Sequence, residues 1–228
     1  MRVSSGVPGF DDLVQGGLLT ERLYVVSGPP GSGKTTFSTM FIMEGARSGE
    51  NCLYVTMHET EEELVQDMAG FDFGFEKAVQ SDAIRFLNLV TEQGKREITQ
   101  FGSDGGLTNR LVGYIEANDV DRAVIDSTML LQHFLSDASD EITGFLSALK
   151  QTDATIVLIS EMTDPSAYSD EHYLAHGVIF FHNYLESGGM TRGIQVIKMR
   201  GTAIDCDIHS IEFTDRGLVV HPGEKIRD

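Results

Sequence analysis

Short runs of branched and aromatic residues recur along the first three quarters of the chain, and segments with helical periodicity separate them. Five such runs lie at residues 23–27, 52–56, 84–89, 123–126 and 155–159. Continuous apolar runs of this length are typical of parallel strands that are buried on both faces. After the first run, Phe37, Met40 and Phe41 recur at the spacing of one helix face. The alternation predicts an α/β fold with a mainly parallel twisted sheet flanked by helices.

The last quarter of the chain has a different pattern. Apolar segments follow one another closely at 178–181, 193–199, 208–213 and 218–220, with glycine-containing turns at 187–189 and 215–217. This pattern predicts antiparallel C-terminal strands that continue the sheet. The polar segment 163–173 carries Pro165 and predicts a mobile loop. Because no linker, repeat or low-complexity tract interrupts the pattern, we expect a single domain over residues 1–228.

The charge of the chain narrows the classes of function. Its 228 residues include 17 Lys and Arg against 35 Asp and Glu, which gives a formal net charge of −18. A surface this acidic repels phosphate backbones and anionic lipids, so nucleic acid and membrane surfaces are not expected partners. The acids are dispersed and lysine is scarce, with 6 Lys against 11 Arg. This balance predicts a surface adapted to high salt and a halophilic source.

Two features predict a cytoplasmic protein. No targeting segment is visible, and no apolar stretch approaches the about 18 residues that a membrane span needs. Cys52 and Cys206 are far apart and both lie in apolar runs. We expect buried free thiols in a reducing compartment rather than a disulfide or a zinc site.

A phosphate-binding loop is the strongest chemical signal. Residues 28–35 fit the pattern G-x-x-x-x-G-K-[ST], follow an apolar run and precede a helical segment. Glycines in such a loop let backbone N–H groups surround phosphate oxygens, and the helix N-terminus adds partial positive charge. Lys34 is expected to reach the β and γ phosphates, and Thr35 to ligate Mg²⁺. The expected nucleotide-binding residues are Gly28, Pro29, Pro30, Gly31, Ser32, Gly33, Lys34, Thr35 and Thr36.

Asp126 is the candidate carboxylate for the same metal ion. It ends the apolar run 122–125 and precedes Ser127. Taken alone, an aspartate at a strand end is more often a turn or cap residue. Together with the phosphate loop upstream, its position predicts a Mg²⁺ site formed by Thr35 and Asp126.

With these residues placed, the chain resembles the KaiC-like branch of the RecA superfamily of ATPases. The shared segments cover nearly the whole length: 5–13 with the pair 16–17, the loop 28–35, and the segments 54–60, 124–127, 160–162 and 198–202. Single-domain KaiC-like proteins of haloarchaea look most similar. The resemblance implies a RecA-like P-loop NTPase core, ATP and Mg²⁺ as cofactors, ring hexamers, and ATP bound between neighbouring subunits.

Lys198 and Arg200 are the candidate trans-acting residues. Strand alternation places them on one face, about 7 Å apart, so both can meet one phosphate. The resemblance implies that this pair reaches the γ-phosphate held by the adjacent subunit, as an arginine finger does. The alternative is a solvated edge strand that carries two basic residues.

The candidate catalytic residues are Lys34, His58 and Glu59. The family's second strand typically ends in two glutamates, and the first is taken as the base that activates water; here that position is His58. A neutral imidazole accepts a proton but lacks the fixed negative charge of a carboxylate. Successive strand residues point to opposite faces, so Glu59 replaces the missing group only if the strand has already ended. His58 as base, Glu59 as base, very slow hydrolysis, and a purely structural His58 all stay open.

The family's clock protein also phosphorylates an adjacent Ser-Thr pair before a late strand. The matching positions here read Tyr173-Leu174-Ala175, so clock-type autophosphorylation is not expected. Ser166 and Ser169 lie nearby and are interpreted as ordinary loop residues.

Three functions are compatible with these features. The first is an ATP-hydrolysing ring that signals its nucleotide state to an unidentified partner protein. The second is a nucleotide-gated scaffold with negligible hydrolysis, which His58 favours. The third is a recombinase relative that binds single-stranded DNA, but the loop 162–171 offers three acids and no Lys or Arg to a DNA backbone.

Overall fold

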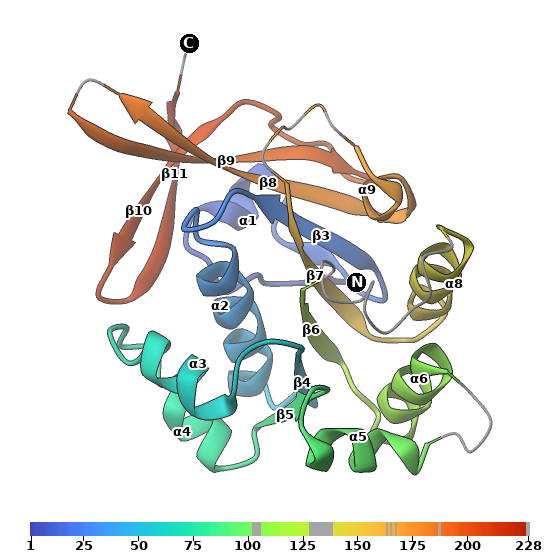
Figure 1. Cartoon of the computed structure of the whole chain (residues 1–228). Coiled ribbons are helices and arrows are strands. Elements are labelled where there is room, and N and C mark those ends of the chain that lie inside the picture. The colour runs from blue at the N-terminus through green and yellow to red at the C-terminus, as the bar shows by residue number, and fades with distance from the viewer. Residues whose placement is uncertain are drawn as a thin grey trace.

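In the part of the chain that the structure describes, nine strands form one sheet (Figure 1). The computed structural model describes residues 1–101, 106–127, 139–162, 164, 166, 168–186 and 188–226. The strands of the sheet are β3 (Leu23–Gly28), β4 (Cys52–Thr56), β5 (Ile84–Asn88), β6 (Arg122–Asp126), β7 (Thr155–Glu161), β8 (Gly177–Glu186), β9 (Gly189–Met199), β10 (His209–Thr214) and β11 (Gly217–Lys225). Their spatial order is β11-β10-β9-β8-β3-β7-β6-β4-β5. A small antiparallel pair, β1 (Arg2–Val3) and β2 (Leu18–Leu19), lies outside this sheet.

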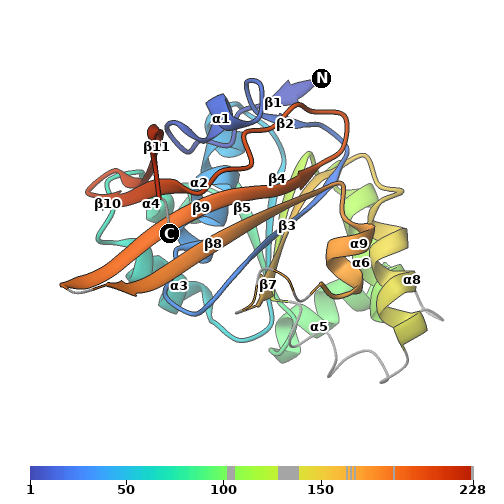
Figure 2. The ribbon, with the colours of Figure 1, turned by 90° about the horizontal axis from the view of Figure 1, so that it is seen from above.

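The pairing confirms the predicted division of the sheet. Strands β3 to β7 pair in parallel, and β8 adds to β3 in parallel. Strands β9, β10 and β11 then continue the sheet as antiparallel neighbours. The β8–β9 hairpin is longer than the apolar pattern predicted, and its tip extends beyond the body of the protein (Figure 2). Polar residues tolerate this extension because both faces of the tip meet solvent.

Helices cover both faces of the parallel strands. They are α1 (Phe10–Leu13), α2 (Lys34–Arg47), α3 (Glu61–Met68), α4 (Phe75–Gln80), α5 (Glu92–Thr99), α6 (Leu107–Ala117), α8 (Ser139–Leu149) and α9 (Asp170–Leu174). Figure 1 shows α2, α3 and α4 on one side of the sheet and α5, α6 and α8 on the other. Figure 2 shows α9 beside α8, on that second side. The result is a three-layered core.

Alternation along β3 explains how one strand contributes to two cores. Tyr24 and Val26 belong to the cluster packed around α2, whereas Leu23 and Val25 belong to the cluster packed around α6 and α8. Because both faces are covered, the strand reads as a continuous apolar run. Because these strands are parallel, the polar residues at their carboxyl ends lie along the same edge of the sheet. Open α/β folds bind their ligands at this edge.

The two cysteines differ in exposure, and one predicted loop is described only in part. Cys52 is buried as expected, but Cys206 is exposed. Its neighbours Asp205 and Asp207 both pair with Lys225, which holds this segment at the surface. The predicted loop 163–173 is described only in part, because residues 163, 165 and 167 lie outside the described residues, as does residue 187 of the predicted 187–189 turn.

Candidate functional site

The phosphate loop joins the end of β3 to the start of α2. Gly28 ends the strand at φ 148°, and a Cβ there would lie 2.5 Å from the carbonyl oxygen of Phe181. Gly33 precedes the helix at φ 113°, and a Cβ there would lie 2.9 Å from the ring of Phe213. Glycine is therefore required at both positions for close approach and for backbone conformation. Between them the loop is open, with Pro30 and Gly31 exposed.

Lys34 is held against its own loop. Its side chain is only 7% exposed, and Nζ donates hydrogen bonds to the carbonyl oxygens of Gly28 (2.8 Å) and Pro29 (3.0 Å). Burial lowers the pKa of Lys34, while the carboxylates of Glu161 and Asp126 raise it. The ammonium therefore lies desolvated at the mouth of the loop, near two acids.

The buried hydroxyl of Ser32 bears on whether the loop fits a phosphate. Its hydroxyl is completely buried and, among the described residues, lacks a hydrogen-bond partner. A buried hydroxyl without a partner costs free energy unless a ligand supplies one. A phosphate oxygen is a suitable acceptor, so the residues present fit a nucleotide phosphate.

Asp126 lies beside the loop at the end of β6. Its side chain is 4% exposed and one carboxylate oxygen accepts a hydrogen bond from the Tyr54 hydroxyl at 3.1 Å. Burial raises the pKa of Asp126 to about 6. Thr35, the second residue of α2, carries a half-buried hydroxyl at the same end of the sheet. One carboxylate and one hydroxyl form the sparse oxygen set with which proteins hold nucleotide-bound Mg²⁺.

Replacing Asp126 by asparagine is expected to stabilise the ligand-free chain at pH 7.5. Because the folded pKa lies at about 6 rather than at 3.8, folding is weakened as the pH rises through that window. The shift is about 2 pKa units and one unit corresponds to about 1.4 kcal/mol, so the free energy of unfolding should rise by about 3 kcal/mol in urea denaturation. The gain should shrink at pH 4.5, whereas Asp12→Asn on the exposed surface should show no gain at either pH. A gain equal at both pH values would contradict the assigned burial effect.

His58 and Glu59 follow the end of β4. The strand stops at Thr56, whose hydroxyl accepts hydrogen bonds from the backbone N–H groups of His58 (3.4 Å) and Glu59 (3.2 Å). Strand alternation therefore does not separate the two side chains, and His58 Nε2 lies 3.4 Å from Glu59 Oε1. The hydrogen bond with Glu59 raises the pKa of His58, against the opposing effect of burial. The pair thus supplies a carboxylate and an imidazole within reach of one proton.

Glu161 belongs to this end of the sheet and was not among the predicted site residues. It ends β7 directly opposite Gly28 in the strand register. Its charge raises the pKa values of Lys34 and His58, so it lies within electrostatic range of both. The available signal was positional, because the last residue of a parallel strand next to the phosphate-loop strand must lie at this edge.

An aromatic wall with one cation also borders the loop. Phe71 and Phe213 lie 6.5 Å apart between ring centroids, and the guanidinium of Arg192 lies 5.3 Å from the Phe213 centroid. Arg192 Nε also donates to the carbonyl oxygen of Gly31 at 3.3 Å. A flat apolar surface with a cation fits a nucleobase beside the phosphates. No sequence pattern predicted it, because residues from the α3–α4 connection, β9 and β10 meet only in the fold.

Lys198 at the end of β9 and Arg200 just after it lie two strands from β3, nearer its start than the phosphate loop. Both donate to the carbonyl oxygen of Tyr173 at the end of α9, at 2.9 and 3.3 Å, so they do share one face of β9. Their neighbour Met199 pairs with Gly177, which in turn pairs with Tyr24 near the start of β3. Four residues of strand, about 13 Å, separate that point from Gly28. Both cations are therefore gathered at α9, toward the opposite end of β3 from the phosphate loop.

The segment matching the family's phosphorylated pair ends α9. Tyr173 and Leu174 close this helix, and Ser169 precedes it as the N-cap. The Ser169 hydroxyl lies 2.6 Å from His172 Nδ1, and the Ser166 hydroxyl donates to Asp164 at 2.6 Å. Both serines therefore make local turn and cap contacts.

Among the described residues, the structure contains no helix long and apolar enough to cross a membrane.

The fold and the loop define a RecA-like P-loop nucleotide-binding protein. The chain belongs to the KaiC ATPase family, whose model matches residues 3–225. Circadian clock protein KaiC3 of Synechocystis is 29% identical over 97% of this chain, and the chain spans 46% of that protein. A UPF0273 protein of Thermotoga maritima is 26% identical and matches over 98% of this chain and 97% of its own length. Among solved structures, a KaiC-like protein of Pyrococcus horikoshii superposes with a TM-score of 0.83 at 28% identity, over 97% of this chain and 99% of its own.

Proposed function

We propose that this protein binds ATP with Mg²⁺ and hydrolyses it slowly, with the nucleotide lying between two subunits. The observation that carries the proposal is the state of the phosphate loop. Lys34 is buried and bonded to its own loop carbonyls, next to the Ser32 hydroxyl, which has no partner in the part of the chain that the structure describes. Both groups suit the oxygens of a triphosphate. Membership of the KaiC ATPase family supports the same activity.

Each residue of the site has a role that follows from its chemistry. Lys34 and the loop N–H groups bind and orient the phosphates, while Thr35 and Asp126 would hold Mg²⁺. When bound, Mg²⁺ neutralises charge on the phosphate oxygens. Glu59, with His58 beside it, accepts the proton of the attacking water. Their exposed side chains, at 29% and 38%, leave room for that water.

Lys198 and Arg200 complete the proposed site in trans. A cation pair at one end of a subunit and a phosphate loop at the other generate a head-to-tail contact, and such contacts close into rings. A homo-hexameric ring is the assembly that the family resemblance implies, with ATP at each subunit boundary. The conformation of the ring would depend on the bound nucleotide, and an unidentified partner protein would recognise that conformation. The similarity to circadian clock proteins supports a signalling role of this kind. The acidic composition supports the proposal that the protein works in a cytoplasm rich in salt, such as that of a halophilic archaeon.

A nucleotide-gated scaffold with negligible hydrolysis is the second candidate. The specific observation in its favour is the His58–Glu59 pair, in which an imidazole stands at the expected base position and contacts the neighbouring carboxylate at 3.4 Å. A carboxylate that already accepts a hydrogen bond takes up a proton less readily. The two candidates differ in turnover rather than in nucleotide affinity.

Replacing His58 by glutamate is expected to raise ATP turnover about tenfold, because it removes the competing imidazole and adds a fixed negative charge. Phosphate release with Mg–ATP over hours measures the change. The matched control is His58→Gln, which removes the imidazole without adding charge and should give a smaller gain. Wild-type release no higher than that of Lys34→Ala would leave the scaffold as the function. Release well above that background would exclude the scaffold.

A further inference from the structure

Basic side chains gather around the start of β3, at the opposite end of this strand from the phosphate loop. Together they form the basic patch, which comprises Arg22, Lys150, His176, Lys198 and Arg200. Arg22 Nη1 lies 3.2 Å from His176 Nε2, and the Arg200 backbone N–H donates to the carbonyl oxygen of His176 at 2.8 Å. Lys150, which follows α8, is close enough to lower the pKa values of both His176 and Lys198. Four of the 17 Lys and Arg of an acidic chain thus share one small surface.

The hydrogen bonds of His176 leave two donors facing each other on this surface. The Leu23 N–H donates to Nδ1 at 3.1 Å, so Nδ1 carries the lone pair. Burial, and then the charge of Arg22, lowers the pKa of His176 to about 4, so the ring is neutral near pH 7 and carries its proton on Nε2. Nε2–H then faces a guanidinium N–H of Arg22 at 3.2 Å. Two donors face each other, and an incoming carboxylate oxygen would satisfy both.

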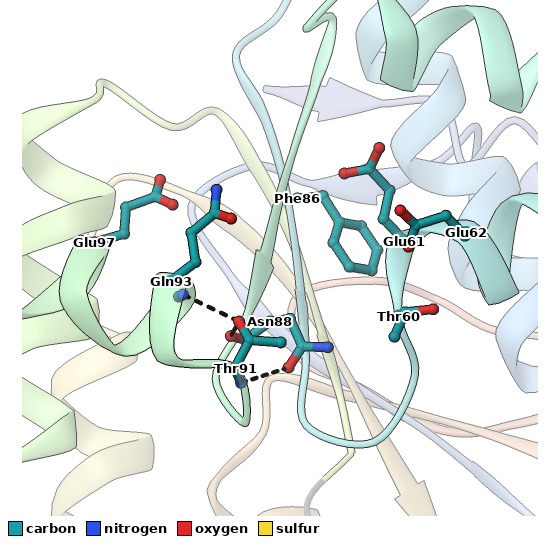
Figure 3. Close-up of a pocket in the computed structure, with 9 residues that line it drawn as sticks. Thr60, Glu61, Glu62, Phe86, Asn88, Thr91, Gln93 and Glu97 are labelled. Carbon is teal, nitrogen blue, oxygen red and sulfur yellow. Dashed lines mark hydrogen bonds between the residues drawn. The ribbon is translucent and has the colours of Figure 1, made fainter.

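Acidic side chains gather at the carboxyl end of β5, the edge strand of the parallel part of the sheet. A pocket of about 190 Å³ lies there. Figure 3 shows Glu61 and Glu62 beside Phe86 on one side of it and Gln93 and Glu97 on the other. We refer to these residues as the acidic pocket. Burial and the neighbouring Glu62 and Asp82 raise the pKa of Glu61, so its carboxylate is crowded by like charge. An incoming cation would relieve this repulsion.

The acidic pocket is tied to the candidate base. Asn88, which lines the pocket, donates from Nδ2 to the carbonyl oxygen of Glu59 at 2.7 Å. The basic patch, in turn, contains Lys198 and Arg200. If this pair acts on the phosphates bound by the next subunit, the rest of the basic patch comes to lie beside Glu59 of that subunit and hence beside its acidic pocket. Each surface then supplies the charge that the other lacks.

We propose that the basic patch is the docking surface for a second copy of this chain, and that Arg22 and Lys150 pair there with Glu61 and Glu62 of that copy. The inference rests on the proposed placement of nucleotide between subunits and adds the contacts that select the neighbour and set its orientation. Because one surface binds a different surface on the next copy, the contact is head-to-tail and suits a closed ring. Charge complementarity of this kind fixes register and excludes wrong partners.

Charge exchange between the two surfaces tests the proposal. We would measure the light-scattering mass of the wild type, of Arg22→Glu/Lys150→Glu, of Glu61→Lys/Glu62→Lys, and of all four substitutions combined, each with Mg²⁺ and a non-hydrolysable ATP analogue. Each double variant should need at least about tenfold more protein to assemble, because like charges then face each other. The fourfold variant should recover most of this loss. The control Lys77→Glu/Arg216→Glu changes the same number of exposed cations outside both surfaces and should assemble like the wild type.

The outcomes separate this inference from the proposed function. A wild type that stays monomeric with nucleotide overturns both. Normal assembly of both double variants overturns the docking contacts alone and leaves trans action of Lys198 and Arg200 in place. A fourfold variant that is no better than the double variants also overturns the pairing. Binding of a fluorescent ATP analogue to isolated subunits should be the same in all variants, which shows that they are folded.

Discussion

Lys34→Ala is expected to weaken binding of a fluorescent ATP analogue at least about a hundredfold. The variant removes the only cation within the loop, and charge-assisted hydrogen bonds to phosphate are among the strongest in proteins. Loss of phosphate release follows from loss of binding. The ligand-free variant should nevertheless be at least as stable as the wild type in urea, because Lys34 is desolvated and its pKa is lowered by burial.

This pairing of effects makes the result interpretable. A variant that binds nucleotide poorly because it is misfolded would also lose stability, whereas removal of a binding group would not. The matched control is Lys77→Ala, which removes an exposed lysine of α4 and should change neither quantity. Unchanged nucleotide affinity in Lys34→Ala would contradict the assignment of the loop as the phosphate site.

Arg200→Ala is expected to lower ATP turnover by about a thousandfold or to the detection limit, as loss of an arginine finger does, while a single subunit keeps its nucleotide affinity. Arg200 follows β9 near the start of β3, whereas the phosphate loop follows the end of β3, so we expect it to act on the loop of a neighbouring subunit. Activity should return when Arg200→Ala is mixed with Lys34→Ala. In such a mixed ring, some boundaries combine an intact loop from one variant with an intact Arg200 from the other.

Mixing distinguishes trans action from action within one subunit. Neither variant alone provides a complete boundary in any arrangement, so recovery above both separate activities requires that the two residues act from different subunits. Arg200→Lys keeps the charge but not the guanidinium geometry and should be intermediate. If no mixture recovers activity, and Arg200→Ala also lowers the affinity of isolated subunits, the residue acts within its own chain.

Much of the sheet could be predicted because burial on both faces leaves a direct record in the sequence. The runs at 52–56 and 84–89 became β4 and β5 almost residue for residue. The β8–β9 hairpin was predicted too short, because its outer part is exposed, as at Leu185 and Met190, and carries no continuous buried apolar run. Cys206 was misplaced because ion pairs of its acidic neighbours, rather than the apolar pattern, decide its exposure.

The candidate site divides along a similar line. Site residues could be predicted where one short segment of sequence carries the chemical pattern, as in the phosphate loop and at Asp126. Glu161, Tyr54 and the Arg192–Phe213 contact were missed because they depend on strand order, which brings together residues more than twenty positions apart. Strand order follows from the packing of whole helices on the sheet, and no local pattern encodes it.

The contacts of Lys34 with its own loop carbonyls bear on competition among anions. In concentrated salt, a bare ammonium at a helix N-terminus would attract chloride at every encounter. Here an incoming ion must first displace two hydrogen bonds of 2.8 and 3.0 Å. A small monovalent anion offers one contact in return, whereas a triphosphate also engages the loop N–H groups and the Ser32 hydroxyl. The loop thereby discriminates by the number of contacts a ligand makes at once, which favours a triphosphate over a single chloride ion.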